Sequence, residues 1–278
     1  MPEQVEGRLL LAPAKLTLSL RVTGQRSGGL HTIESEMVSV SLFDELRLFP
    51  SDEAGSTEIL MTDPLGLSGL GFSLAEIPLG GGNLISKAMD MATVRGKVEL
   101  AKRIPPGAGL GGGSADAAAV LRALMPRVDP RTTLELGSDV PFCVAVRRST
   151  VTGVGDEISP LPALDGRWVL FLIPVHSPTG AVYAAYDLGA RGDFEECGND
   201  LEEAAIAVTP ELGRYREMIA GKIRVRPRMA GSGSTYFAEG TLASLGLDRM
   251  VPIGPGVVAF EEDGLGCLAA EVHEVNAL

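Results

Sequence analysis

The chain has 278 residues, of which 45% are hydrophobic and 22% charged, enough for one large globular domain or two modest ones. Its 24 basic and 36 acidic residues give a net charge of −12, which argues against general nucleic-acid binding and docking on anionic membranes. No apolar run approaches the roughly 18 residues of a membrane span, and residues 1–8 lack a signal-peptide core. We therefore expect a cytoplasmic protein.

The cysteines and histidines do not form a metal-binding pattern. Cys143, Cys197 and Cys267 are widely spaced and odd in number, which favours reduced thiols over a disulfide framework or a zinc site. The three histidines are scattered, and none has ligand spacing with a cysteine.

The first element expected is a strand over residues 15–22. Leucines at alternate positions are separated by polar residues, a pattern typical of a half-buried strand. Lys15 and Thr17 then share the polar face. From this pattern alone, Lys15 is a solvated lysine.

Several elements are expected before residue 104, where a glycine-rich stretch begins. Residues 38–49 are expected to form a strand broken near Asp44, residues 57–61 a second strand, and residues 64–82 a long irregular connection. Asn83 is expected to cap a helix over 83–94. Residues 97–104 are expected to form a strand whose apolar face Lys102 interrupts. This lysine either meets a nucleotide or is simply exposed.

A glycine-rich stretch over residues 104–120 organises the chain. Five glycines lie within residues 107–113, and apolar residues at helical spacing follow. We expect a loop entering a helix, with Ser114 as N-cap and Pro126 as the stop. Unpaired N–H groups and the helix dipole make such an N-terminus an anion site, and glycines permit close backbone approach. The stretch therefore predicts a phosphate site.

Two better-known phosphate loops fit this stretch poorly. A Walker loop requires a Lys after its last glycine, whereas Ser114 follows Gly113. Gly107, Gly109 and Gly112 match a dinucleotide-binding pattern, but that loop follows the first strand of a βαβ unit directly. Here two prolines intervene and over a hundred residues precede, so we treat the match as accidental.

A carboxylate follows the next predicted helix. Residues 129–137 combine an Asp cap, a following Pro and a terminal Gly, which predicts a short helix. A strand is expected through Val146. Asp139 lies between the two, where it is either a partly desolvated carboxylate or a turn residue that bonds to the backbone.

The second half of the chain begins after a segment punctuated by glycine and proline, residues 151–166. A buried strand is expected over 168–175, and helices over 181–188, 199–208 and 210–220. Arg224, Arg226 and Arg228 suggest a solvated strand face, and short helix and strand signals alternate toward the C-terminus.

A second glycine loop occupies residues 229–237 and leads into a strand. One such loop is weak evidence. Two loops of different kinds predict a polyphosphate held from two sides.

Several of these stretches resemble motifs of the GHMP small-molecule kinases. Residues 105–119 resemble the family's phosphate loop, residues 13–17 its N-terminal motif, and residues 229–237 its third motif. Finer motifs at 29–31, 83–85, 137–142 and 198–201 extend the likeness, in order, over nearly the whole chain.

The resemblance implies an α+β fold with two domains. Residues 1–158 are expected to resemble the second domain of ribosomal protein S5 and to carry the ATP-binding glycine loop. Residues 159–278 are expected to be ferredoxin-like and to contribute to substrate binding, with the site between the two.

The resemblance also implies transfer of the γ-phosphoryl of ATP to the 2-hydroxyl of a cytidine diphosphate-linked methylerythritol, a step in non-mevalonate isoprenoid biosynthesis. Asp139 matches the proposed general base and Lys15 its cationic neighbour, which reverses the solvated interpretation of Lys15. The family's nucleotide-binding positions correspond to Lys102, Pro105, Gly107, Gly109, Leu110, Gly111, Gly112, Gly113 and Ser114. Ser114 would also serve Mg²⁺. The family's substrate-binding positions correspond to Thr17, His31, Thr179 and Tyr183.

The chain departs from the family pattern at four places. Leu30 stands where Tyr is usual, Thr17 where Asn is common and Ala115 where a second Ser is common, and residues 124–134 form a shorter segment. These departures keep two alternatives open: a kinase for another small alcohol, and a non-catalytic nucleotide-binding relative. The net charge opposes RNA binding. We expect a small-molecule substrate, no nucleic-acid or membrane partner, and a monomer or weak homodimer.

Overall fold

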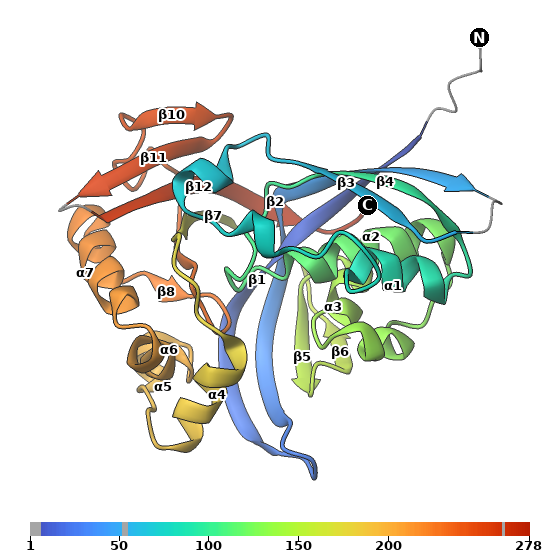
Figure 1. Cartoon of the computed structure of the whole chain (residues 1–278). Coiled ribbons are helices and arrows are strands. Elements are labelled where there is room, and N and C mark those ends of the chain that lie inside the picture. The colour runs from blue at the N-terminus through green and yellow to red at the C-terminus, as the bar shows by residue number, and fades with distance from the viewer. Residues whose placement is uncertain (1–6, 52–54, 263–264) are drawn as a thin grey trace.

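A computed structural model describes residues 7–51, 55–262 and 265–278. Its backbone is built on a long antiparallel hairpin of β1 (Arg8–Gln25) and β2 (His31–Ser51), which extends between two groups of helices (Figure 1). β2 is continuous, so the break expected near Asp44 is wrong. The irregularity is a register shift in which Pro13 pairs with Phe43 and Ala14 with Val40. Such a bulge bends a strand without ending it.

One sheet of 12 strands contains this hairpin, with a main path in the order β3-β4-β2-β12-β7-β9-β8. The remaining strands are β3 (Glu58–Thr62), β4 (Arg95–Ala101), β5 (Ser149–Gly153), β6 (Glu157–Pro160), β7 (Arg167–Leu172), β8 (Arg228–Met229), β9 (Tyr236–Glu239), β10 (Val251–Gly254), β11 (Val257–Glu262) and β12 (Leu265–Val275). The strands expected at 57–61 and from 168 onward are confirmed as β3 and β7. β4 ends before Lys102, so the strand expected through Ile104 is shorter than predicted.

Helices cover the sheet in two groups. They are α1 (Leu84–Met91), α2 (Gly112–Leu124), α3 (Val140–Ala145), α4 (Thr179–Asp187), α5 (Phe194–Cys197), α6 (Glu202–Val208) and α7 (Glu211–Ile223), with 3₁₀ turns η1 (Leu67–Leu70), η2 (Leu74–Glu76) and η3 (Pro130–Leu136). Asn83 caps α1 by accepting from the N–H of Ile85, and Asp129 caps η3 in the same way from Arg131. Both caps are confirmed predictions.

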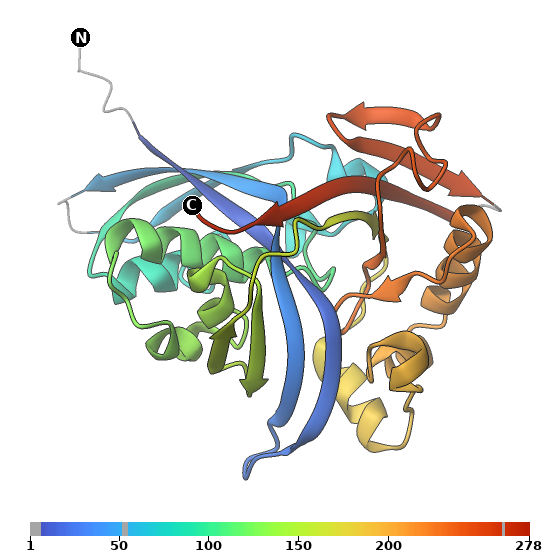
Figure 2. The ribbon, with the colours of Figure 1, turned by 180° about the vertical axis from the view of Figure 1, so that it is seen from behind.

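The first group, α1 to α3, packs beside the strands of the N-terminal half (Figure 2). α2 is the central helix of this group because it contacts α1, α3 and β1. Its apolar face is fully buried and includes Val120 and Leu121, as the helical spacing predicts. The sheet contributes Leu46 and Leu100 to the same core.

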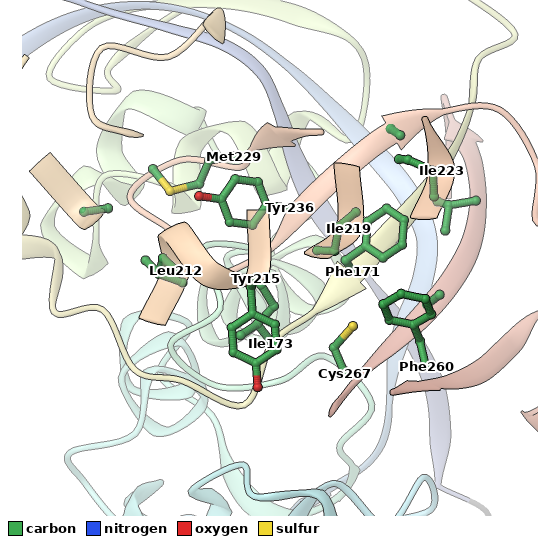
Figure 3. Packing of buried hydrophobic residues seen from close by; sticks show 14 of the residues in the cluster. Phe171, Ile173, Leu212, Tyr215, Ile219, Ile223, Met229, Tyr236, Phe260 and Cys267 are labelled. Carbon is green, nitrogen blue, oxygen red and sulfur yellow. The ribbon is translucent and has the colours of Figure 1, made fainter. Parts of the chain in front are cut away.

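The second group, α4 to α7, lies at the opposite end of the sheet. Its core is rich in aromatic residues from both layers, including Phe171, Tyr215, Tyr236 and Phe260 (Figure 3). Phe171 and Phe260 meet edge to face, with ring centroids 6.4 Å apart. This core anchors the segments that precede and follow the second glycine loop.

β12 links the two halves into one sheet. Glu274 and Val275 pair with β2, and residues 268–273 pair with β7. The boundary placed after residue 158 falls within β6, and the first irregular segment beyond it is 161–166. A division into two domains stays a prediction, and residues 161–166 suit its linker better.

Two other expectations are wrong. The apolar run after Asp139 is helix α3, not a strand, because Pro141 takes an N-terminal helix position and the segment packs on α2. Outside residues 263–264, the C-terminal stretch consists of turns and of strands β10 to β12, and the short helices expected are absent from it. No helix within the described residues is long and apolar enough to cross a membrane.

Candidate active site

The phosphate loop enters α2 through glycine. Gly111 is the N-cap, with a φ of 64°, and the helix begins at Gly112. Ser114 is therefore the third helical residue and not the cap, which corrects the prediction. A left-handed N-cap favours glycine, so the loop turns into the helix without a capping side chain. The Ser114 hydroxyl forms no hydrogen bond with the residues that the structure describes, and it is available to a ligand.

The two glycine loops pack backbone against backbone. Thr235 N–H donates to the carbonyl of Ala108 at 3.2 Å. A Cβ on Gly109 would lie 2.5 Å from the carbonyl oxygen of Ala230 and 2.7 Å from that of Gly233. These distances leave no room for a side chain, so Gly109 is required for the two loops to meet.

A lysine and an aspartate meet beside the phosphate loop. Lys15 Nζ lies 3.5 Å from Asp139 Oδ2, and the two side chains are 7% and 30% exposed. Lys15 Nζ also donates to Thr17 Oγ1 at 3.1 Å. Lys15 is thus not the solvated lysine that the strand pattern suggests. Asp139 occupies the N-cap position of α3 but makes no capping bond with its side chain, so its carboxylate is free to act at Lys15.

A cavity of about 720 Å³ opens over this pair. Its lining combines residues from distant parts of the chain, namely Lys15, His31, Asp139, Thr179, Tyr183 and Ser232. Together with Gly109, which also lines the cavity, six predicted site residues therefore share it. Thr17 does not line it, because its side chain is buried and bonded to Lys15.

An aromatic pair forms part of the cavity wall. His31 stacks on Tyr183 with ring centroids 4.6 Å apart and an interplanar angle of 23°. His31 Nε2 lies 2.8 Å from Asp187 Oδ1, which orients the imidazole. Burial, with a further contribution from the negative charge of Asp139, raises the pKa of Tyr183 to about 12, so its hydroxyl stays protonated. Leu30 lines the same cavity and is 65% exposed.

The second glycine loop is attached to α4 and to the segment between α5 and α6. The hydroxyls of Thr179 and Ser232 lie 2.9 Å apart. Asn199 Nδ2 donates to the carbonyls of Met229 and Gly231, each at 2.8 Å. Sequence reasoning missed Asn199, although it lies in a quoted motif, residues 198–201. The sequence offered one signal for this role: Asn199 follows a glycine and precedes a segment of apolar and acidic residues.

The loop residues predicted to bind nucleotide differ in how far they are exposed to solvent. The side chains of Pro105 and Leu110 are buried, so only backbone groups of these residues belong to the loop surface. Gly107 is exposed and lies against His176, whose Nδ1 is 2.6 Å from the position of a Cβ. The backbone of residues 111–114 forms the turn and the first positions of α2.

Lys102 does not reach the cavity. Its ammonium lies under the loop, where it donates to Asp44 Oδ2 at 2.5 Å and Asp116 Oδ2 at 3.0 Å. The Lys102 side chain is 3% exposed, so the alternative that this lysine is simply exposed is wrong, whereas nucleotide binding by Lys102 stays a prediction. Sequence reasoning missed both carboxylates, because their approach depends on how β2 packs against α2.

The arginine run is likewise not a simple solvated face. Arg226 forms ion pairs with Glu196 and with buried Glu202, and the guanidinium of Arg228 lies 4.8 Å from the Phe237 ring centroid. Arg224 ends α7 in a left-handed conformation. The three cysteines are buried and free, as expected.

Comparison with known proteins agrees with this geometry. A family model described as "GHMP kinases N terminal domain" matches residues 83–145, which include the phosphate loop and Asp139. A 4-diphosphocytidyl-2-C-methyl-D-erythritol kinase of Paracoccus denitrificans is 36% identical over 266 residues, covering 88% of this chain and 92% of that protein. One of Paramagnetospirillum magneticum is 34% identical over 257 residues, covering 81% and 86%.

Solved structures give the same result. A crystal structure of 4-(cytidine 5'-diphospho)-2C-methyl-D-erythritol kinase superposes with a TM-score of 0.65 and 28% identity, covering 96% of this chain and 99% of that one. Mevalonate kinase from L. major has a TM-score of 0.59 at 12% identity, covering 100% of both chains, which shows a shared fold. The chain belongs to the 4-diphosphocytidyl-2-C-methyl-D-erythritol kinase family, a branch of the GHMP kinases.

Proposed function

We propose that this protein transfers the γ-phosphoryl group of ATP to the 2-hydroxyl of 4-diphosphocytidyl-2-C-methyl-D-erythritol. One observation carries the proposal: the Lys15–Asp139 pair lies between a glycine loop at a helix N-terminus and a cavity of about 720 Å³. A phosphate donor and an alcohol acceptor would meet at that junction. The names of the relatives supply the identity of the alcohol.

Asp139 is the proposed general base. Its carboxylate accepts the proton of the substrate hydroxyl as the oxygen forms a bond to the γ-phosphorus and the bond to the β-phosphate oxygen breaks. The adjacent Lys15 ammonium favours the ionised carboxylate and is placed to orient the hydroxyl. Thr17 fixes the ammonium through the 3.1 Å hydrogen bond between their side chains.

The phosphate loop is the proposed ATP site. Backbone N–H groups at the start of α2 point out of the helix and carry its positive dipole, which suits the triphosphate. Mg²⁺ supplies charge neutralisation in phosphoryl transfer. Ser114 is the residue proposed to hold it, because its hydroxyl has no partner among the described residues. Among the residues that the structure describes, no group of three or more His, Cys, Asp or Glu side chains is arranged to hold a metal.

The other end of the cavity is the proposed cytidine site. Tyr183 and His31 present stacked rings there, and Thr179 presents a hydroxyl. Aromatic faces bind nucleobases by stacking. Thr17 belongs to this site only indirectly, through Lys15.

A phosphorus NMR time course tests the proposal. ATP, Mg²⁺ and 4-diphosphocytidyl-2-C-methyl-D-erythritol are incubated with the protein and, in parallel, with Asp139→Asn. A new phosphomonoester signal that the variant fails to produce is the expected result. ATP binding without a product contradicts the proposed activity and favours a non-catalytic relative.

A second candidate function is phosphorylation of another small alcohol. Leu30 motivates it, because an exposed leucine stands in the cavity where the family usually has an aromatic residue. The same NMR assay with a panel of small alcohols, including mevalonate and homoserine, separates the two candidates. Faster turnover of one of these alcohols would favour the second.

A further inference from the structure

The tip of the β1–β2 hairpin forms one end of the cavity. Gly29, Leu30 and His31 line the cavity there. The N–H of Arg26 donates to the carbonyl of Leu30 at 2.8 Å, and that carbonyl belongs to the peptide bond that leads to His31. The backbone of Arg26 therefore fixes the part of the tip that faces the proposed cytidine site.

A second turn, residues 154–156 between β5 and β6, supports the proposed general base. Gly155 is buried and has a φ of 98°. A Cβ at Gly155 would lie 2.3 Å from the carbonyl oxygen of Ser138, so the turn packs directly against the peptide bond that precedes Asp139. Gly155, Ser138 and Asp139 all line the cavity. A displacement of this turn would therefore displace Asp139.

An ion pair between Arg26 and Asp156 joins the hairpin tip to this turn. The guanidinium donates from Nη1 and Nη2 to Asp156 Oδ2, both at 3.2 Å, and from Nη2 to Oδ1 at 3.3 Å. A contact with several hydrogen bonds between planar groups fixes orientation as well as distance. The two side chains are 45% and 23% exposed, so the pair contributes little to stability. Its geometry is better explained by positioning.

The Asp156 carboxylate is also held by its own turn. Oδ1 accepts a hydrogen bond from the N–H of Val154 at 2.9 Å. Gly153 has a φ of 68°, and a Cβ there would lie 2.3 Å from Asp156 Oδ1 and 3.0 Å from Arg26 Nη2. Glycine thus leaves the space in which the two charged groups meet. Burial acts to raise the pKa of Asp156, but backbone N–H groups of the turn and Arg26 outweigh it and lower that pKa, so the carboxylate stays ionised.

Strand pairing does not extend to the hairpin tip on the β5 side. β2 pairs with β5 as far as Ile33 and Gly153, where β5 ends. The hairpin continues beyond this point, past β5 on one side and α4 on the other (Figures 1 and 2). On the α4 side, His31 contacts Asp187. The ion pair of Arg26 is the matching contact on the side of the proposed base.

We propose that Arg26 and Asp156 are positioning residues that hold the cytidine end of the cavity and the Asp139 carboxylate in one fixed arrangement. Neither of the two side chains lines the cavity, so they act through the tip and the turn. An alcohol anchored at one end must reach the base at the other, and a misplacement of about 1 Å slows such a reaction strongly. This inference rests on the proposed function, because it takes Asp139 to be the base.

Steady-state kinetics of Arg26→Gln, Asp156→Asn and the double variant test the proposal. Each single variant should lower kcat/KM for 4-diphosphocytidyl-2-C-methyl-D-erythritol by about 10- to 100-fold, through a lower kcat and a higher KM, whereas KM for ATP should not change. The double variant should lose no more than either single variant, because both changes remove the same contact. Arg26→Lys keeps the charge and should recover part of the loss.

Arg95→Gln is the matched control. The Arg95 side chain is 40% exposed and pairs with Asp90, and neither residue lines the cavity. This variant should have the kinetics of the unmodified protein. Three results would overturn the proposal: an unchanged kcat/KM in Arg26→Gln, the same loss in Arg95→Gln, or additive losses in the double variant.

Hydrogen exchange provides a readout that needs no turnover. Arg26→Gln should increase exchange over residues 26–31 and also over residues 138–143, because the pair joins these two segments across the cavity. Arg95→Gln should change neither segment. Unchanged exchange in residues 138–143 would contradict the inference. The expected exchange in a protein that does not phosphorylate the cytidine substrate would contradict the proposed function instead, and would leave the connection between the two segments standing.

Discussion

Lys15 Nζ lies 3.5 Å from Asp139 Oδ2, although one residue is on the first strand and the other precedes α3. Gly111 permits this approach, because a Cβ there would lie 2.8 Å from Lys15 Cγ and 3.5 Å from Asp139 Oδ2. The phosphate loop, the lysine and the carboxylate are consequently one packed unit. This relationship is the basis of the first prediction.

Asp139→Asn should lower kcat by about 10²- to 10⁴-fold, the usual contribution of a general base. Affinity for an ATP analogue should change little, because the carboxylate is not part of the loop. Steady-state kinetics and calorimetry measure the two effects. Asp129→Asn is the matched control, since Asn also serves as a helix cap. An Asp139→Asn protein with full turnover would exclude Asp139 as the base.

Gly109→Ala should separate the two glycine loops. The residue has a φ of 76°, and the added Cβ would meet two backbone oxygens at 2.5 and 2.7 Å. The left-handed conformation alone costs about 1–2 kcal/mol, and the clash adds to it. We expect a lower melting temperature and strongly weakened binding of an ATP analogue.

Gly221→Ala is the control for this change. Gly221 is exposed on α7 with no atom within 4 Å of its Cβ position, so alanine should raise stability by about 0.5–1 kcal/mol. If Gly109→Ala binds the nucleotide as tightly as the unmodified protein, the contact between the two loops is not required for nucleotide binding.

Bulky side chains at Gly111 or Gly112 should abolish nucleotide binding. At Gly111 a Cβ would lie 2.8 Å from Lys15 Cγ, and at Gly112 it would lie 2.9 Å from Lys102 Nζ. Both neighbours are held by ion pairs, so neither can move away freely. Calorimetry on Gly111→Val and Gly112→Val measures the loss. Unchanged affinity in both would show that this part of the loop does not contact the ligand.

Asn199→Ala should loosen the second glycine loop. The side chain is 1% exposed and bonds to the carbonyls of Met229 and Gly231 and to Leu201 N–H. Each buried group left unpaired costs about 1–3 kcal/mol. Denaturant unfolding should show this loss, and hydrogen exchange should increase over residues 229–235. Asn276→Ala, at an exposed position, should change neither. Wild-type exchange in Asn199→Ala would exclude the positioning role.

Leu30→Tyr should improve use of the cytidine-containing substrate. An aromatic contact contributes about 0.5–1.5 kcal/mol beyond its buried area, so KM for that substrate should fall by roughly two- to tenfold while KM for ATP stays the same. Leu188→Tyr is the control, because Leu188 is 90% exposed and, unlike its neighbour Asp187, is not part of the cavity lining. Identical effects of the two substitutions would show that Leu30 does not lie near the cytosine ring of the bound substrate.

Local sequence signals predicted local structure well where one interaction dominates. Asn83 and Asp129 satisfy the N–H groups of their own helices, so each cap was identified from neighbouring residues. The density of glycine before an apolar helical pattern likewise predicted a loop that leads into α2. At Ser114 the same reasoning failed, because a serine competes with glycine as N-cap and the left-handed turn at Gly111 decides the outcome.

The apolar segment after Asp139 could not be assigned from its own residues. A short apolar segment is compatible with either a buried strand or a buried helix, and packing against α2 selects the helix. That choice matters for function, because it makes Asp139 the residue before a helix and turns its carboxylate toward Lys15.

By itself, the sequence determined the two glycine loops, the alternating strand that carries Lys15, and a family resemblance through motifs in order along the chain. All of these depend on residues close together in sequence. Tertiary structure alone decided the partners of the charged side chains: Lys15 faces Asp139 at the cavity, whereas Lys102 is buried between Asp44 and Asp116. The physical reason is that the energy of a charge depends on which groups surround it. In both cases those groups come from strands and helices far apart in the chain.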